Sequence, residues 1–144
     1  MNFRRQWIPG IGLLVTVAVA SYMVVQLQAQ TADYANAAFA EVRDPQGQIV
    51  LRGQFLAVDD DDDIERKATL AQTGVDTDAT GEAEVEYAKE TPTLQEVEFS
   101  VRNVQPGATF TFVIDGQDVG TATADRRGRA EMEIDVSSPA AGAR

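Results

Sequence analysis

The sequence contains no cysteine and no histidine, and only one tryptophan among its 144 residues. Without cysteine the chain cannot form a disulfide, a thiolate nucleophile or a lipidated cysteine anchor. Without histidine, imidazole general bases and the common zinc and copper ligand sets are also excluded. The length suits one ordinary domain and is too short for two. These absences narrow the function classes before any motif is considered.

Basic residues are scarce as well, with 12 Lys and Arg against 23 Asp and Glu. Because Arg4 and Arg5 lie at the N-terminus, the rest of the chain holds 10 basic residues against 23 acidic ones, a formal charge of −13. Such a charge repels nucleic acid and anionic lipid headgroups. Cations or a basic protein partner are favoured instead. The same charge also keeps a protein hydrated and dispersed.

The N-terminus combines a basic start with a long apolar run. Arg4 and Arg5 are followed by no further charge before Asp33, and residues 11–25 are almost continuously apolar. This is the pattern of a secretory signal peptide or of an uncleaved signal-anchor helix. We therefore assign residues 1–29 to membrane targeting.

The leader allows two outcomes that the sequence leaves open. Residues 7–27 are about as long as a helix that crosses ~30 Å of hydrocarbon, so the chain contacts the membrane there if the leader is not cleaved. Leu27-Gln28-Ala29 is an imperfect signal peptidase site, because leucine stands where a small residue is preferred. Cleavage predicts a periplasmic or extracellular protein. Retention predicts an inner-membrane anchor with the C-terminal domain outside the cytoplasm, since the positive N-terminus stays inside.

Beyond the leader, apolar and polar residues alternate as in half-buried strands. The alternation is clearest over residues 96–102, 109–114, 119–124 and 130–136, and it predicts four strands in a meander. Asp115-Gly116 is a hairpin signal, because glycine tolerates the positive φ of a tight turn. The earlier half predicts a hairpin around residues 44–47 and further strands near residues 64–70 and 83–87.

These segments together predict an all-β protein. We expect an antiparallel β-sandwich or Greek-key barrel of about seven or eight strands, preceded by the N-terminal hydrophobic helix. The expected boundaries are a linker over residues 30–36, an acidic β-sandwich domain over residues 37–137 and a disordered C-terminal tail over residues 138–144.

Acidic residues occupy the outward positions of two predicted strands. The rows are Glu82, Glu84 and Glu86 in one strand and Glu131, Glu133 and Asp135 in another. Like charges on one strand face are expected to be solvated and to oppose edge-to-edge aggregation. Paired carboxylates also occur in glycosidases, but 23 acidic residues will always supply some pair at a suitable spacing.

Two aspartate-rich segments are candidate Ca²⁺ sites, because clustered carboxylates are the ligands that this cation prefers. The first is the run Asp59, Asp60, Asp61, Asp62 and Asp63 between two predicted strands. The second contains Asp76 and Asp78, which match the opening of an EF-hand loop, whereas Tyr87 occupies the place of its final glutamate. A solvated connection held extended by self-repulsion is the alternative for the aspartate run.

The segment Leu94–Val136 resembles a module of exported bacterial β-proteins, on the residues Pro106-Gly107, Asp115-Gly116, Val119-Gly120-Thr121, Thr123-Ala124-Asp125 and Gly128. More distantly it is similar to the CHRD domain and to the copper/zinc superoxide dismutase-like sandwich. The resemblance covers about a third of the chain and implies an eight-stranded Greek-key sandwich or a relative of one. The metal-site histidines of those families are absent, which excludes dismutase activity.

The sequence does not name a specific activity. We predict a noncatalytic exported envelope module with a structural, adhesive or ligand-binding role, without a nucleophile–base pair, a catalytic residue or a bound cofactor other than Ca²⁺. The alternative is a calcium-dependent or carboxylate-based hydrolase, which would require an acidic cleft with aromatic walls.

Overall fold

The computed structural model describes residues 32–59 and 63–138. These residues form nine β-strands and no helix. The strands are β1 (Phe39–Arg43), β2 (Ile49–Gln54), β3 (Leu56–Asp59), β4 (Asp63–Gln72), β5 (Thr80–Ala88), β6 (Leu94–Arg102), β7 (Thr109–Ile114), β8 (Gln117–Thr123) and β9 (Ala130–Ser137). The predicted antiparallel all-β fold is confirmed, with nine strands in place of seven or eight. The predicted N-terminal helix lies outside the described residues.

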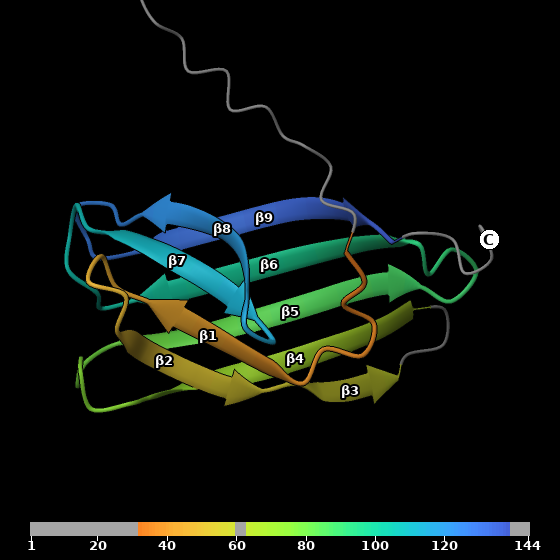
Figure 1. The fold of residues 1–144 in the computed structure, drawn as a ribbon, viewed down its shortest axis with the longest axis horizontal. Helices are drawn as coiled ribbons and strands as arrows, with labels where there is room; N and C mark the ends of the chain where they lie inside the picture. Colours follow the sequence, from red (N-terminus) through yellow and green to blue (C-terminus); the bar gives the residue numbers. More distant parts are fainter. Residues whose placement is uncertain (1–31, 60–62, 139–144) are drawn as a thin grey trace, which may run out of the picture.

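The strands form one antiparallel sheet that folds back on itself. Its order is β8-β7-β1-β2-β4-β5-β6-β9, with β3 paired to β4 outside this path. The sheet turns at β4, whose last residues pair with β2 (Leu51↔Gln72) while the rest of the strand pairs with β5. The sheet thereby forms two layers that cross each other (Figure 1). The front layer contains β2, β1, β7 and β8, and the back layer contains β3, β4, β5, β6 and β9.

The two end strands of this path, β8 and β9, nearly close the sheet into a barrel. Gly120 of β8 faces Met132 of β9 so closely that a Cβ at Gly120 would lie 2.4 Å from the Met132 Sδ. The methionine side chain thus occupies the space that a larger residue on β8 would need. Close approach of this kind is one reason for glycine within a strand.

The strands predicted over residues 94–136 are present, but the prediction that they form a meander, with each strand paired to the next, is wrong. β6 pairs with β9 along its whole length, whereas the β7–β8 hairpin crosses to the front layer and pairs with β1. The crossing connection carries Val104, which is 4% exposed and anchors the link in the core. Alternation of apolar residues identifies a strand but not its partner, because every half-buried strand shows the same period of two.

The core lies between the two layers. Phe99 of β6 and Phe112 of β7 are both fully buried, and their ring centroids are 4.8 Å apart at an interplanar angle of 36°. Such tilted contacts add to the stabilisation that burial of the two rings provides. Valine, leucine and isoleucine side chains from alternate strand positions fill the remaining volume. The largest are Val42, Leu51, Val85, Val97, Val101, Ile114 and Val136.

Asp33–Ala38, which we call the N-terminal strap, folds against one end of the core. Tyr34 is 5% and Ala37 2% exposed. The Tyr34 N–H donates to the Gln95 Oε1 at 2.8 Å, and the Arg66 guanidinium donates to the Ala37 carbonyl at 2.9 Å. The strap includes part of the segment expected to be a linker, so the chain already contacts the domain at Asp33.

Two turns match their sequence signals. In the β1–β2 turn the Asp44 carboxylate accepts the N–H groups of Gln46 and Gln48. In the β7–β8 turn Asp115 and Gly116 both have positive φ, 48° and 82°. The Asp115 carboxylate also accepts the N–H of Phe39 at 2.8 Å, so this turn positions the start of β1 as well.

Candidate functional site

One outer surface of the back layer is built almost entirely from carboxylates. The register places outward positions of β4, β5, β6 and β9 beside one another, because paired residues of neighbouring strands project to the same side. Ten carboxylates share this surface, which we call the acidic face. They are Asp63, Glu65, Glu82, Glu84, Glu86, Glu96, Glu98, Glu131, Glu133 and Asp135.

The carboxylates of the acidic face are neighbours across strands. Glu84 is paired with Glu98, which is paired in turn with Glu133, so three carboxyl groups follow one another across three strands. Like charges in direct cross-strand pairs are destabilising. Among the described residues Lys67 and Arg102 are the cations of this face, and Arg129 reaches its margin, 3.7 Å from the Glu131 Oε1. Lys67 is ion-paired with Glu65 and Glu84, so most of the ten carboxylates have no cationic neighbour among these three residues. The face therefore holds repulsive energy that a bound cationic group would relieve.

Crowding on the acidic face changes its protonation equilibria. Partial burial, with further contributions from Glu65, raises the pKa of Glu84 from 4.5 to about 7. The pKa of Glu65 is lowered, chiefly by its hydrogen bond with Glu84 and also by Lys67. Burial and the surrounding carboxylates, with Glu133 first among them, raise the pKa of Glu96. The face therefore exchanges protons more readily near neutral pH than isolated glutamates would.

A shallow hollow of about 600 Å³ lies at one end of the acidic face. Glu86, Glu96 and Asp135 line it as one cross-strand row, and Leu94 and Ala88 contribute apolar surface. Leu94 is 64% exposed. The hollow combines negative charge with an apolar patch, which suits an amphipathic cationic group such as a lysine side chain.

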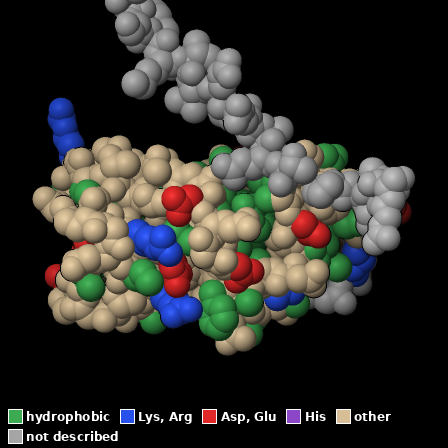
Figure 2. Space-filling model, viewed as in Figure 1, with side chains coloured by type: hydrophobic (Ala, Val, Ile, Leu, Met, Phe, Trp, Pro, Cys, Tyr) green, Lys and Arg blue, Asp and Glu red, His purple; other side chains and the backbone are tan. Residues whose placement is uncertain are grey.

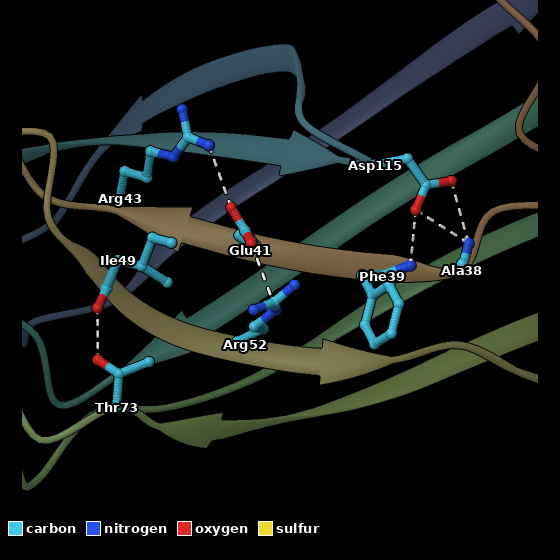
Figure 3. Close-up of polar contacts among 8 residues, drawn as sticks. All are labelled: Ala38, Phe39, Glu41, Arg43, Ile49, Arg52, Thr73 and Asp115. Atoms are coloured by element: carbon cyan, nitrogen blue, oxygen red, sulfur yellow. Dashed lines mark hydrogen bonds and ion pairs between the residues drawn. The ribbon is translucent and has the colours of Figure 1, made fainter.

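The outer surface of the front layer has a different character. Glu41 of β1 lies between Arg43, at 3.1 Å, and Arg52, at 3.3 Å, and is only 8% exposed (Figure 3). The Arg52 guanidinium also lies 5.0 Å from the centroid of the Phe39 ring. Figure 2 shows acidic, basic and apolar side chains interspersed over this face. Glu41 is balanced by two arginines here, whereas the carboxylates of the acidic face outnumber the cations beside them, so we take the acidic face as the candidate binding surface.

The candidate calcium ligands are not brought together in the described residues. Asp59 and Asp63 lie at the facing ends of β3 and β4, and Asp60, Asp61 and Asp62 lie outside the described residues. The Asp76 carboxylate accepts the N–H groups of Asp78 and Ala79, which makes a local turn. Among residues 32–59 and 63–138 no three acidic side chains are grouped so that they would hold a metal ion.

The sequence anticipated the outward rows on β5 and β9 but not the acidic face as a whole. Glu96 and Glu98 of β6 join the two rows, because β6 lies between β5 and β9 in the sheet. The signal for these residues was present in the alternation around Val97 and Phe99. What was missing was the pairing of β6 with β9 in place of β7.

No family model, curated protein or solved structure matches this chain. The resemblance to CHRD and superoxide dismutase-like domains therefore stays a prediction. The described residues contain no helix with the length and hydropathy needed to cross a membrane. The predicted leader lies outside them.

Proposed function

We propose that this protein is a noncatalytic module of the bacterial envelope, exported by its N-terminal leader, that binds a basic protein partner through the acidic face. The observation that carries the proposal is the gathering of ten carboxylates from four strands on one outer surface, against three cations among the described residues, Lys67, Arg102 and Arg129. The formal charge of the whole chain, −11, acts in the same direction. Complementary potential speeds encounter with a basic partner and rejects anionic ones.

The exposed position of the carboxylates supports a binding role over a catalytic one. A hydrolase that depends on carboxylates needs an enclosed cleft in which one acid stays protonated and water is excluded. Of the described acids with raised pKa, Glu84 lies on the open surface of the sheet and the exposed Glu96 lines the shallow hollow at its end. A surface of this kind supplies attraction and orientation without a place to hold a reacting bond.

The proposal is tested by binding of fluorescently labelled decalysine to the full chain at several salt concentrations. The affinity should fall steeply as salt rises, because screening weakens attraction between exposed charges. A variant with Glu98→Gln, Glu131→Gln and Glu133→Gln should bind roughly tenfold more weakly, from about 0.5 kcal/mol for each lost charge pair.

A matched variant separates the acidic face from overall charge. Asp78→Asn, Asp118→Asn and Gln46→Lys change the net charge by the same amount at exposed positions in loops and on the front layer, away from the face. We expect this control to change the affinity by less than about threefold, since distant exposed charges are screened. Equal losses in the two variants would show that only net charge matters and would refute binding by the acidic face.

Export is tested separately, by cell fractionation with N-terminal sequencing of the product. A mature N-terminus near residue 30 in the periplasm or medium shows cleavage, and an intact chain in the inner membrane shows anchoring. An intact chain in the cytosol would refute export and leave the binding test unaffected.

A further inference from the structure

β3 presents a strand edge that has no partner among the described residues. It pairs with β4 on one side only, from Leu56↔Lys67 to Asp59↔Ile64. Leu56 is 66% and Val58 47% exposed. By register both project to the same side as Lys67 and Glu65, so they border the acidic face. Figure 1 shows β3 at the lower margin of the molecule, beyond the start of β1.

The path of the chain before β1 explains why no described strand covers this edge. β1 begins at Phe39, opposite Gln54, and would have to continue backwards through residues 32–38 to lie along β3. Instead the N-terminal strap leaves that line and turns into the core, where its backbone is bound by Gln95 and by Arg66, the register partner of Ala57 in β3. The Ala38 carbonyl accepts the Phe55 N–H at 2.9 Å. Beyond this hydrogen bond the N-terminal strap and β3 diverge.

An uncovered strand edge offers a row of backbone N–H and C=O groups to an additional strand. In soluble proteins such edges are commonly blocked by lysine, proline or a bulge. The described side chains of β3 that border the acidic face are Leu56 and Val58, which are apolar. A strand added there would place every second side chain over Leu56 and Val58, next to the first carboxylates of the acidic face.

We propose that the β3 edge is the docking site for an extended, basic segment of a partner protein, which adds to β4–β3 as the next strand of the back layer. This inference rests on the proposed function and adds the location and backbone geometry of binding. Charge complementarity selects the occupant, although the side chains next to the added strand are Leu56 and Val58. One strand further lie Glu65 and Lys67, and Lys67 is ion-paired with Glu65 and Glu84. The outward positions beyond them are all carboxylates (Glu84, Glu86, Glu96 and Glu98), so the net charge beside the edge is negative and favours lysine or arginine.

A second copy of this chain fits the edge less well. Pairing β3 with β3 of another copy would join two acidic faces into one surface, and each chain carries a formal charge of −11. Like-charge juxtaposition of this extent opposes association. Addition of a basic segment as a strand instead reduces the repulsion among the carboxylates and gives hydrogen-bond partners to the backbone groups at the β3 edge.

The test uses the full chain and an eight-residue probe peptide in which lysine and valine alternate. A matched peptide has the same sequence with alternate backbone nitrogens methylated, which keeps the charge but removes strand hydrogen bonds. We expect the methylated peptide to bind at least about tenfold more weakly, because backbone pairing supplies affinity that charge alone does not.

Two protein variants locate the site. Leu56→Lys places a positive charge on the β3 edge, and Val75→Lys places the same charge in the β4–β5 loop, at the opposite end of β4 from β3. Leu56 is 66% and Val75 49% exposed, so neither change should affect folding, which a thermal melt checks. We expect Leu56→Lys to weaken binding of the unmethylated peptide at least about tenfold and Val75→Lys less than about threefold.

The outcomes separate this inference from the proposed function. Equal effects of the two variants, a larger effect of Val75→Lys, or equal affinity for the two peptides would overturn docking at β3 and leave binding by the acidic face intact. Absence of salt-sensitive binding to either peptide would overturn both proposals. Self-association in sedimentation experiments that Leu56→Lys abolishes would show that a second copy occupies the edge, which also overturns the inference.

Discussion

Substitution of Gln95 by alanine should loosen the N-terminal strap and destabilise the domain. Gln95 is 2% exposed, and its amide makes three hydrogen bonds. Its Oε1 accepts the Tyr34 N–H at 2.8 Å, and its Nε2 donates to the Asp33 Oδ1 at 2.9 Å and to the Pro92 carbonyl at 3.1 Å. One side chain therefore links the strap, the β5–β6 connection and β6.

The expected loss follows from these contacts. Each hydrogen bond contributes about 1 kcal/mol net, and a buried N–H left without an acceptor, here that of Tyr34, costs about 1–3 kcal/mol. The loss cannot exceed the free energy of detaching the strap, because the strap can open while the rest of the core stays folded. We expect Gln95→Ala to lower the free energy of unfolding by about 2–4 kcal/mol.

Urea denaturation gives this free energy, and hydrogen exchange of the strap amides tests the mechanism. Exchange should accelerate over residues 33–38 more than in β6 and β9. Gln72→Ala is the control, since Gln72 is exposed at the end of β4, and it should change stability by less than about 0.5 kcal/mol. An equally small change in Gln95→Ala, with strap exchange unaltered, would refute the assigned role of Gln95.

Two further predictions concern the acidic face and a turn. The pKa of Glu84 is raised from 4.5 to about 7 in the folded protein. The stabilisation that its protonated form provides is therefore complete below pH 4.5 and is lost as the pH rises to about 7. Replacement of Glu84 by glutamine should flatten the fall in melting temperature over that pH interval. A flattening no greater than that caused by Glu131→Gln would contradict this. Gly128→Ala should cost at least about 2 kcal/mol, because φ is +70° and a Cβ would lie 2.4 Å from the Val104 carbonyl oxygen. Gly47→Ala, at φ +80° with no atom within 4 Å, should cost less in the same denaturation assay, and equal costs would show that the contact with Val104 is unimportant.

Local patterns determined the strands, turns and charge of this protein. Alternation around Phe99, Phe112 and Met132 identified β6, β7 and β9, and Asp115-Gly116 identified the turn that joins β7 to β8. These features depend on residues close in sequence, through strand periodicity and the positive φ of tight turns. β3 was not anticipated, because Leu56–Asp59 is only four residues long and continues the line of β2 after Phe55.

Only the tertiary structure decided which strands are neighbours, and the candidate site depends on that choice. The acidic face exists because β6 lies between β5 and β9, which places Glu96 and Glu98 between the predicted acidic rows. No described strand lies along the free edge of β3, and the strap that precedes β1 is held elsewhere by Gln95, 61 residues from Tyr34 in sequence. Both features arise from contacts between distant segments, and a pattern that repeats every two residues contains no information about which distant strand will be its partner.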